Sequence, residues 1–108
     1  MGFFDFLKQP DINKGVMEYR NTDGAVLLDV RTPEEFAERH IPGAINIPNE
    51  TISTEEIPEL PDKDQLILVY CRSGNRSKQA SEKLVALGYT NIVEFGGIND
   101  WPGETVTE

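Results

Sequence analysis

The chain has 108 residues, 38% of them hydrophobic, which allows one domain with a single core. Its formal net charge of -9 makes nucleic acid and anionic membrane surfaces poor partners, because like charges repel. A single cysteine excludes an intrachain disulfide and a Cys-x-x-Cys redox pair.

The start of the chain, residues 1–10, is apolar but short. It holds three phenylalanines and Leu7 and ends at Pro10, and Asp5 interrupts the apolar run. We expect it to fold over the core or onto a partner chain, with a membrane-surface anchor as the less favoured alternative. The sequence has neither the pattern of a signal peptide nor an apolar run of about twenty residues. We therefore expect a cytoplasmic protein without a membrane span.

Strand and helix patterns alternate from residue 11 to residue 103, which we interpret as one domain followed by a frayed tail at 104–108. Short apolar runs predict strands at 25–30, 44–47, 66–70 and 92–95, and a short edge strand is expected at Asp11-Ile12. Helices are predicted at 13–20, 32–39, 53–60 and 78–87, with a last helical turn at 99–101. The expected apolar side of the first helix consists of Val16, Met17 and Tyr19. This alternation predicts an α/β fold with a parallel sheet and helices on both faces.

Two of the helices are predicted from capping boxes. Residues 32–35, Thr-Pro-Glu-Glu, combine such a box with proline at the first helical position, and Phe36 and Ala37 are the expected buried side of that helix. Residues 53–56, Ser-Thr-Glu-Glu, have the same pattern, and Pro58 can limit the helix that follows.

The segment 66–87 brings a cysteine to the start of a helix. An apolar strand ends on Cys71, a small polar loop follows, and a helical pattern then runs to Gly88, the expected left-handed cap. Ligands of parallel α/β sheets bind beyond the carboxyl ends of the strands, which is where this thiol falls. Gly74 and Asn75 permit the backbone angles that let several N–H groups converge on one point. We therefore expect a ring of amides around the sulfur, at the positive end of a helix.

Three basic residues gather beside this cysteine. They are Arg72, Arg76 and Lys78, in a chain with nineteen acids and ten bases. A solvated face is the alternative explanation for these bases, and it suits Lys78 best. Together with the amides, the positive charges favour the thiolate, whereas a free thiol is only about 3% ionised at pH 7. We predict that Cys71 is a nucleophile rather than an inert core residue.

The rest of the sequence limits what Cys71 can attack. The single histidine, His40, stands in a turn-forming connector, so we favour a structural role for it over a general base and do not expect a cysteine protease. One cysteine and one histidine cannot form a zinc cage, and we expect no metal. Two reactions on anions remain, which are phosphoryl transfer and the transfer of sulfane sulfur.

Four motifs, in this order, resemble those of the single-domain rhodaneses (thiosulfate sulfurtransferase-like proteins). They are LLDVR with PEEF at 27–36, HIPGAINIP at 40–48, VYCRSGNRS at 69–77 and GGINDW at 96–101. The resemblance covers residues 11–103. It implies the rhodanese α/β fold with a five-stranded, mostly parallel sheet between helices. It also implies a cysteine persulfide intermediate and no metal or organic cofactor.

The same resemblance assigns the site residues. Cys71 is similar to the sulfur-accepting nucleophile of the family, and the rest of its active-site loop corresponds to Arg72, Ser73, Gly74, Asn75, Arg76 and Ser77. Asp29 and Arg31 match a strand-end pair that we interpret as mainly structural, with Arg31 either paired with Glu35 or lining the mouth of the pocket. The implied partners are a small anionic sulfur donor such as thiosulfate and a thiol or protein-cysteine acceptor.

Two alternatives to a sulfurtransferase remain. Related phosphatases and some arsenate reductases place arginine six positions after the cysteine, where this chain has Ser77, and Arg76 lies one position earlier. Arsenate reductases often also need a second cysteine, which this sequence lacks. A protein-specific sulfur carrier, with little turnover of small donors, fits the same motifs as the enzyme.

Overall fold

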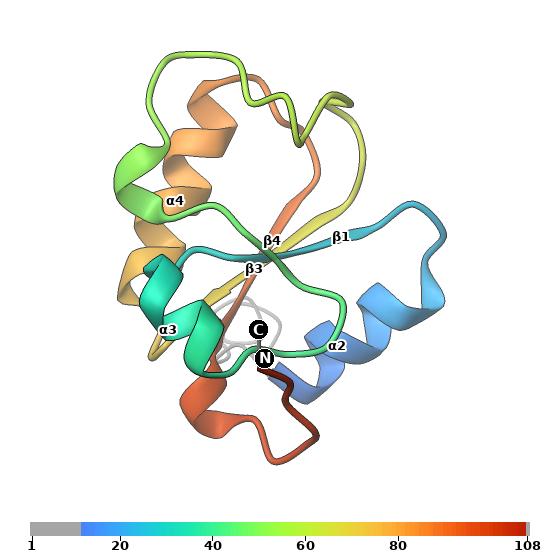
Figure 1. The fold of residues 1–108 in the computed structure, drawn as a ribbon. Coiled ribbons are helices and arrows are strands. Elements are labelled where there is room, and N and C mark those ends of the chain that lie inside the picture. Colours follow the sequence, from blue (N-terminus) through green and yellow to red (C-terminus); the bar gives the residue numbers. More distant parts are fainter. Residues whose placement is uncertain (1–11, 108) are drawn as a thin grey trace, which may run out of the picture.

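The computed structural model describes residues 12–107, in which helices and strands alternate along the chain (Figure 1). The helices are α2 (Ile12–Asn21), α3 (Pro33–Glu38) and α4 (Asn75–Ala86), with the 3-10 turns η1 (Asn49–Thr51) and η2 (Ile98–Asp100). The strands are β1 (Val26–Asp29), β2 (Ile45–Asn46), β3 (Ile67–Cys71) and β4 (Ile92–Gly97). No helix within the described range combines the length and the apolarity needed to cross a membrane.

The strands form one sheet in the order β2-β1-β3-β4, and every neighbouring pair is parallel. The α/β class and the parallel pairing are therefore confirmed. The prediction of five strands is wrong for residues 12–107, which form a sheet of four. The strand expected at 11–12 is not formed because Ile12 begins α2 and packs with Val16, one helical turn later, in the same apolar cluster. Asp11 lies outside the described residues.

The central strand β3 divides the core into two apolar clusters. Leu68 and Tyr70 pack in one cluster with residues of α2, and Val69 and Cys71 pack in the other with residues of α4. This alternation follows from the period of two along a strand. All five residues of β3 are at most 1% exposed. The thiol of Cys71 is therefore fixed on the α4 side of a strand that is buried on both faces.

The two predicted capping boxes have different outcomes. The box at Thr32 is confirmed: its hydroxyl accepts the N–H of Glu35 at 3.2 Å, the Glu35 carboxylate accepts the N–H of Thr32 at 2.9 Å, and α3 follows. The helix predicted at 53–60 is wrong, since this segment contains only bends and turns. Ser53 bonds the N–H of Glu55, two residues on, at 3.4 Å, which is a local turn that competes with a helix.

Three smaller predictions about exposure and order are wrong. Ala37 in α3 is exposed and so is Met17 in α2, at 58%, because each helix turns only a narrow side toward the sheet. The expected fraying of 104–108 fails at Val106, whose N–H and carbonyl both bond to the backbone of His40 at 2.9 Å. The end of the described chain is thus attached to the segment that follows α3.

Candidate active site

Cys71 is the last residue of β3, and a short turn connects it to α4. Gly74 closes this turn with φ at 114°, in the left-handed region that favours glycine. Its carbonyl accepts the N–H of Lys78 at 3.2 Å, so α4 begins at Asn75, ahead of its predicted start at Lys78. Residues 75–77 therefore form the first turn of the helix rather than a loop.

The predicted loop residues surround the thiol unequally. Cys71, Gly74 and Ser77 are buried, Arg76 is half-buried, and Arg72, Ser73 and Asn75 are exposed. The Gly74 N–H donates to Cys71 Sγ at 2.9 Å, and Ser77 Oγ lies 3.5 Å from the same sulfur. In the described chain this is the one backbone bond to the sulfur, fewer than the predicted ring of amides. The other amides in the first turn of α4 have no helical acceptor, so they can bind an anion placed beyond the sulfur.

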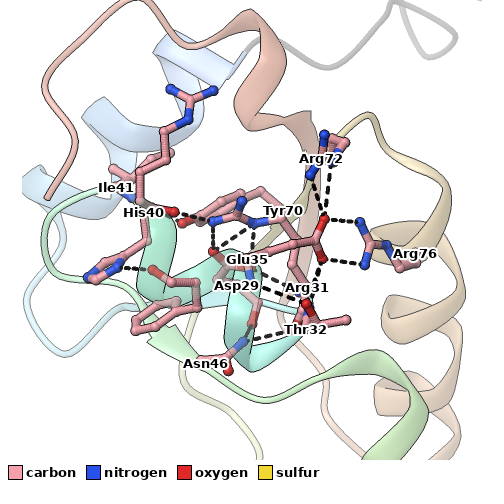
Figure 2. Close-up of polar contacts among 12 residues, drawn as sticks. Asp29, Arg31, Thr32, Glu35, His40, Ile41, Asn46, Tyr70, Arg72 and Arg76 are labelled. Carbon is pink, nitrogen blue, oxygen red and sulfur yellow. Dashed lines mark hydrogen bonds and ion pairs between the residues drawn. The ribbon is translucent and has the colours of Figure 1, made fainter. Parts of the chain in front are cut away.

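A carboxylate of α3 holds both arginines of the loop (Figure 2). Arg76 forms a bidentate pair with Glu35, with Nη1 2.7 Å from Oε1 and Nη2 3.0 Å from Oε2. Arg72 Nε donates to Oε2 of the same carboxylate at 3.1 Å. The sequence indicated these arginines as charges that favour the Cys71 thiolate, and it did not reveal this pairing. The capping box revealed Glu35, but its arginine partners lie 37 and 41 residues further along the chain.

The pairing changes the ionisation of both partners. The hydrogen bonds from the Arg76 guanidinium lower the pKa of the Glu35 carboxyl far below its ordinary value of 4.5, burial opposes them, and the Thr32 N–H and Arg72 add to the lowering. The same bonds raise the pKa of Arg76. The Glu35 side chain is 17% exposed, so water screens this pair less than a surface pair. Glu35 and the two arginines that it binds therefore remain charged through the physiological pH range.

Glu35→Gln is expected to lower the free energy of unfolding by about 1–3 kcal/mol at pH 7, because a charged acceptor of two arginines is lost. The lowered pKa means that the ionised carboxylate stabilises the folded state. The difference from wild type should be constant above about pH 5.5 and should shrink as the pH falls below 4.5, where the unfolded chain takes up a proton first. Urea denaturation at a series of pH values measures this difference.

Glu34→Gln is the matched control, because Glu34 is an exposed acid in the same first turn of α3. It should change the free energy of unfolding by less than about 0.5 kcal/mol at every pH. A Glu35→Gln effect that did not vary with pH would contradict the role assigned to the carboxylate.

A buried ion pair lies behind the site, at the end of β1 (Figure 2). Arg31 Nη2 lies 2.7 Å from Asp29 Oδ2, and the two side chains are 3% and 0% exposed. The same Nη2 donates to the Arg39 carbonyl at 2.6 Å, and the guanidinium lies 5.9 Å from the centre of the Tyr70 ring. Arg31 forms its ion pair with Asp29, and neither a pair with Glu35 nor a position at the mouth of a pocket is observed for it. Its contacts instead link β1 to the end of α3.

His40 and Tyr70 make their hydrogen bonds with backbone groups of residues 36 and 41. The His40 Nδ1 lies 2.8 Å from the Phe36 carbonyl, and the two rings stack with centroids 3.6 Å apart. A carbonyl only accepts, so this nitrogen carries the proton and is not free to act as a base. The Tyr70 hydroxyl accepts the N–H of Ile41 at 3.1 Å, and burial raises the pKa of Tyr70. These contacts agree with the structural interpretation of His40.

The end of β4 forms the wall against which the cysteine turn packs. A Cβ on Gly97 would overlap the carbonyl of Arg72, and that carbonyl also accepts the N–H of Asn99 at 3.1 Å. A register shift in the β3–β4 pairing sets Gly97 opposite Cys71. Glycine is required here because two backbones approach closely, and its φ of -143° is ordinary.

The arrangement of the site defines a class of protein. A parallel α/β sheet carries a buried cysteine at the turn from its central strand to the N-terminus of a helix, with cations beside it. Within residues 12–107 no three His, Cys, Asp or Glu side chains lie together so that they could hold a metal ion. The site is therefore that of an α/β domain with a buried cysteine at the turn from a strand to a helix N-terminus.

Comparison with known proteins identifies the family. The chain belongs to the family described as Rhodanese-like domain, which matches residues 13–104, and the resemblance found in the sequence is confirmed. Thiosulfate sulfurtransferase PspE of Escherichia coli (strain K12) is 41% identical over 73 residues, 68% of this chain and 70% of the relative. Thiosulfate sulfurtransferase GlpE of Pseudomonas entomophila (strain L48) is 36% identical over 88 residues, 77% of this chain and 79% of the relative.

A solved structure gives the same result for the fold. The structure of a rhodanese with anions from E. coli matches with a TM-score of 0.71 and 38% sequence identity. The match covers 79% of this chain and 100% of that chain. The rhodanese-like α/β fold is therefore shared.

Proposed function

We propose that this chain is a sulfurtransferase that carries sulfane sulfur on Cys71 as a persulfide. The observation that supports this most directly is the buried Cys71 thiol, which accepts the Gly74 N–H at 2.9 Å at the N-terminus of α4. Two relatives that match most of this chain are named thiosulfate sulfurtransferase. A thiolate is the nucleophilic form of cysteine, and an amide donor together with a helix N-terminus favours it.

The reaction has two steps. The thiolate of Cys71 attacks the outer sulfur of thiosulfate, a new S–S bond forms, and the old S–S bond breaks with its electron pair leaving on sulfite. A thiophilic acceptor then attacks the outer sulfur of the persulfide, and the S–S bond breaks to return the thiolate. No metal or organic cofactor takes part, since both steps are nucleophilic displacements at sulfur.

The surroundings of the sulfur suit an anionic donor. The first-turn amides at residues 75–77 and the N-terminal end of α4 attract negative charge beyond Sγ. Glu35 holds Arg72 and Arg76 in fixed positions and neutralises part of their charge. We propose that the two arginines orient a small donor rather than grip it, because a bidentate grip by Arg76 would require release of Glu35.

The test is a panel of donors applied to the wild-type protein, followed by intact-mass analysis. Thiosulfate, polysulfide and glutathione persulfide are compared, and we expect one added sulfur atom that cyanide then removes as thiocyanate. Loading without cyanide turnover, followed by rapid discharge to a protein thiol, would replace the enzyme with a sulfur carrier. Hydrolysis of an aryl phosphate without sulfur loading would favour a phosphatase, and a mass unchanged by every donor would reject sulfur transfer.

A further inference from the structure

A carboxylate of β4 reaches the catalytic turn through a serine hydroxyl. Ser77 Oγ lies 2.6 Å from Glu94 Oε2, 2.9 Å from the Gly74 carbonyl and 3.5 Å from Cys71 Sγ. Ser77 is fully buried, at 0% exposure, so water does not compete for these contacts. Among residues 12–107, the Ser77 hydroxyl is thus the one group that contacts both the Glu94 carboxylate and the Cys71 sulfur.

We infer that Glu94 is a positioning residue that restrains the ionisation of Cys71 by accepting the hydrogen bond that the Ser77 hydroxyl would otherwise donate elsewhere. This inference rests on the proposed function of Cys71 as the nucleophile. The sequence indicated a strand position for Glu94 and no role in the site.

The hydroxyl of Ser77 carries a single proton. A hydroxyl donates one hydrogen bond and accepts others, whereas an ionised carboxylate only accepts. Hydrogen bonds to charged acceptors are the stronger ones, and the contact with Glu94 is the shortest that Ser77 makes. Ser77 therefore donates to Glu94 and turns a lone pair toward Cys71.

The direction in which the Ser77 hydroxyl points decides whether it supports the thiol or the thiolate form of Cys71. A thiol can donate its S–H proton to the lone pair of Ser77, whereas a thiolate needs a donor. While Glu94 is ionised, Ser77 supports the thiol and Gly74 is left as the backbone donor to a thiolate. If a substitution removes the charge of Glu94, the hydroxyl proton of Ser77 is released to its two remaining acceptors, the Gly74 carbonyl at 2.9 Å and the sulfur at 3.5 Å, and a proton shared with the sulfur supports the thiolate.

The position of Glu94 is held by the fold. The Gly96 N–H donates to the same Oε2 at 2.9 Å, which fixes the carboxylate against the end of β4. Glu94 also lines a hollow of about 330 Å³ together with Ser81, Glu82, Val85 and Ile92.

Other charged groups near the pair do not replace this effect. On α4, Arg76 is bound by Glu35, and Glu82 shares the hollow with Glu94. On β3, the titratable group that faces Ser77 is Cys71 itself. Helix α2 packs on the opposite face of the sheet, in the cluster that contains Phe95. The hydroxyl of Ser77 thus gives Glu94 a direct route to the sulfur that Glu82 lacks.

The test measures the rate of alkylation of Cys71 by iodoacetamide, a neutral reagent, as a function of pH. Glu94→Gln is expected to move the midpoint of this profile to lower pH and to raise the rate at neutral pH by about tenfold. Glu94→Leu, which removes every acceptor and suits a half-buried strand position, should change the profile in the same direction. Both measurements use the full chain and need no sulfur donor.

Two controls separate this route from a general charge effect. Glu82→Gln removes the same charge from the same hollow and should leave the midpoint within a small fraction of the Glu94→Gln shift. In a Ser77→Ala background, Glu94→Gln should lose most of its effect. A midpoint that stays in place, moves to higher pH, or moves equally in the Ser77→Ala background would overturn the inference. A protein that shows the predicted shift but takes up no sulfur would instead reject the proposed function alone.

Discussion

The Cys71→Ser variant is expected to take up no sulfur from thiosulfate and to lose at least about a thousandfold of cyanide-dependent turnover. A serine hydroxyl is not ionised near neutral pH and is a poor nucleophile toward sulfur. The sequence contains no other cysteine that could accept the sulfur in its place. Intact-mass analysis after incubation with thiosulfate measures loading, and thiocyanate formation measures turnover.

Wild-type protein blocked with iodoacetamide is the matched control for this variant, because it keeps every residue and loses only the free thiol. The two samples should be equally inactive, and urea denaturation should show that Cys71→Ser remains folded. Sulfur loading of the serine variant at the wild-type level would rule out Cys71 as the carrier.

The second large effect is expected on stability, from Asp29→Ala. This change leaves the guanidinium of Arg31 buried at 3% exposure without its carboxylate partner, so we expect the free energy of unfolding to fall by about 3–5 kcal/mol. The free energy of unfolding of natural domains is only about 5–15 kcal/mol, so this loss should be easy to measure by urea denaturation. We expect this loss of stability because the charge of Arg31 is left buried without a partner, and not because its attraction to Asp29 is itself strongly stabilising.

A double variant tests that reason. Asp29→Leu with Arg31→Met replaces the ion pair by apolar side chains, and it should be more stable than Asp29→Ala alone, since no charge is left buried. Asp29→Asn, which keeps an oxygen acceptor for Arg31, should fall between wild type and Asp29→Ala. Equal loss in the double variant and in Asp29→Ala would show that the pair itself, and not the orphaned charge, stabilises the fold.

Local patterns predicted most of the fold. The apolar run that ends at Cys71 and the capping box at Thr32 each carry their own structural signal within a few residues, and both elements form where expected. The same four-residue pattern at 53–56 gives no helix, because a competing local turn at Ser53 is equally compatible with those residues. At 11–12 the pair Asp11-Ile12 is too short to distinguish a strand from the first turn of a helix.

The site was only partly visible in the sequence. The turn around Cys71 is local, and its position at the carboxyl end of a strand follows from the class of fold. The roles of Glu35 and Glu94 depend on contacts between elements that are far apart in the chain, with 41 residues from Glu35 to Arg76 and 17 from Ser77 to Glu94. A single sequence does not show which acid meets which loop residue, so both were missed.

The double use of Glu35 has a consequence for local motion. Helix α3 has six residues, fewer than the roughly twelve that an isolated helix needs in water, so much of its order comes from outside. The carboxylate that caps it is the one that Arg72 and Arg76 hold. Loss of the Glu35 carboxylate from its place at the start of α3 would therefore remove the helix cap and the acceptor of both guanidinium groups together. The order of this short helix and the net charge of the cysteine turn thus depend on one side chain.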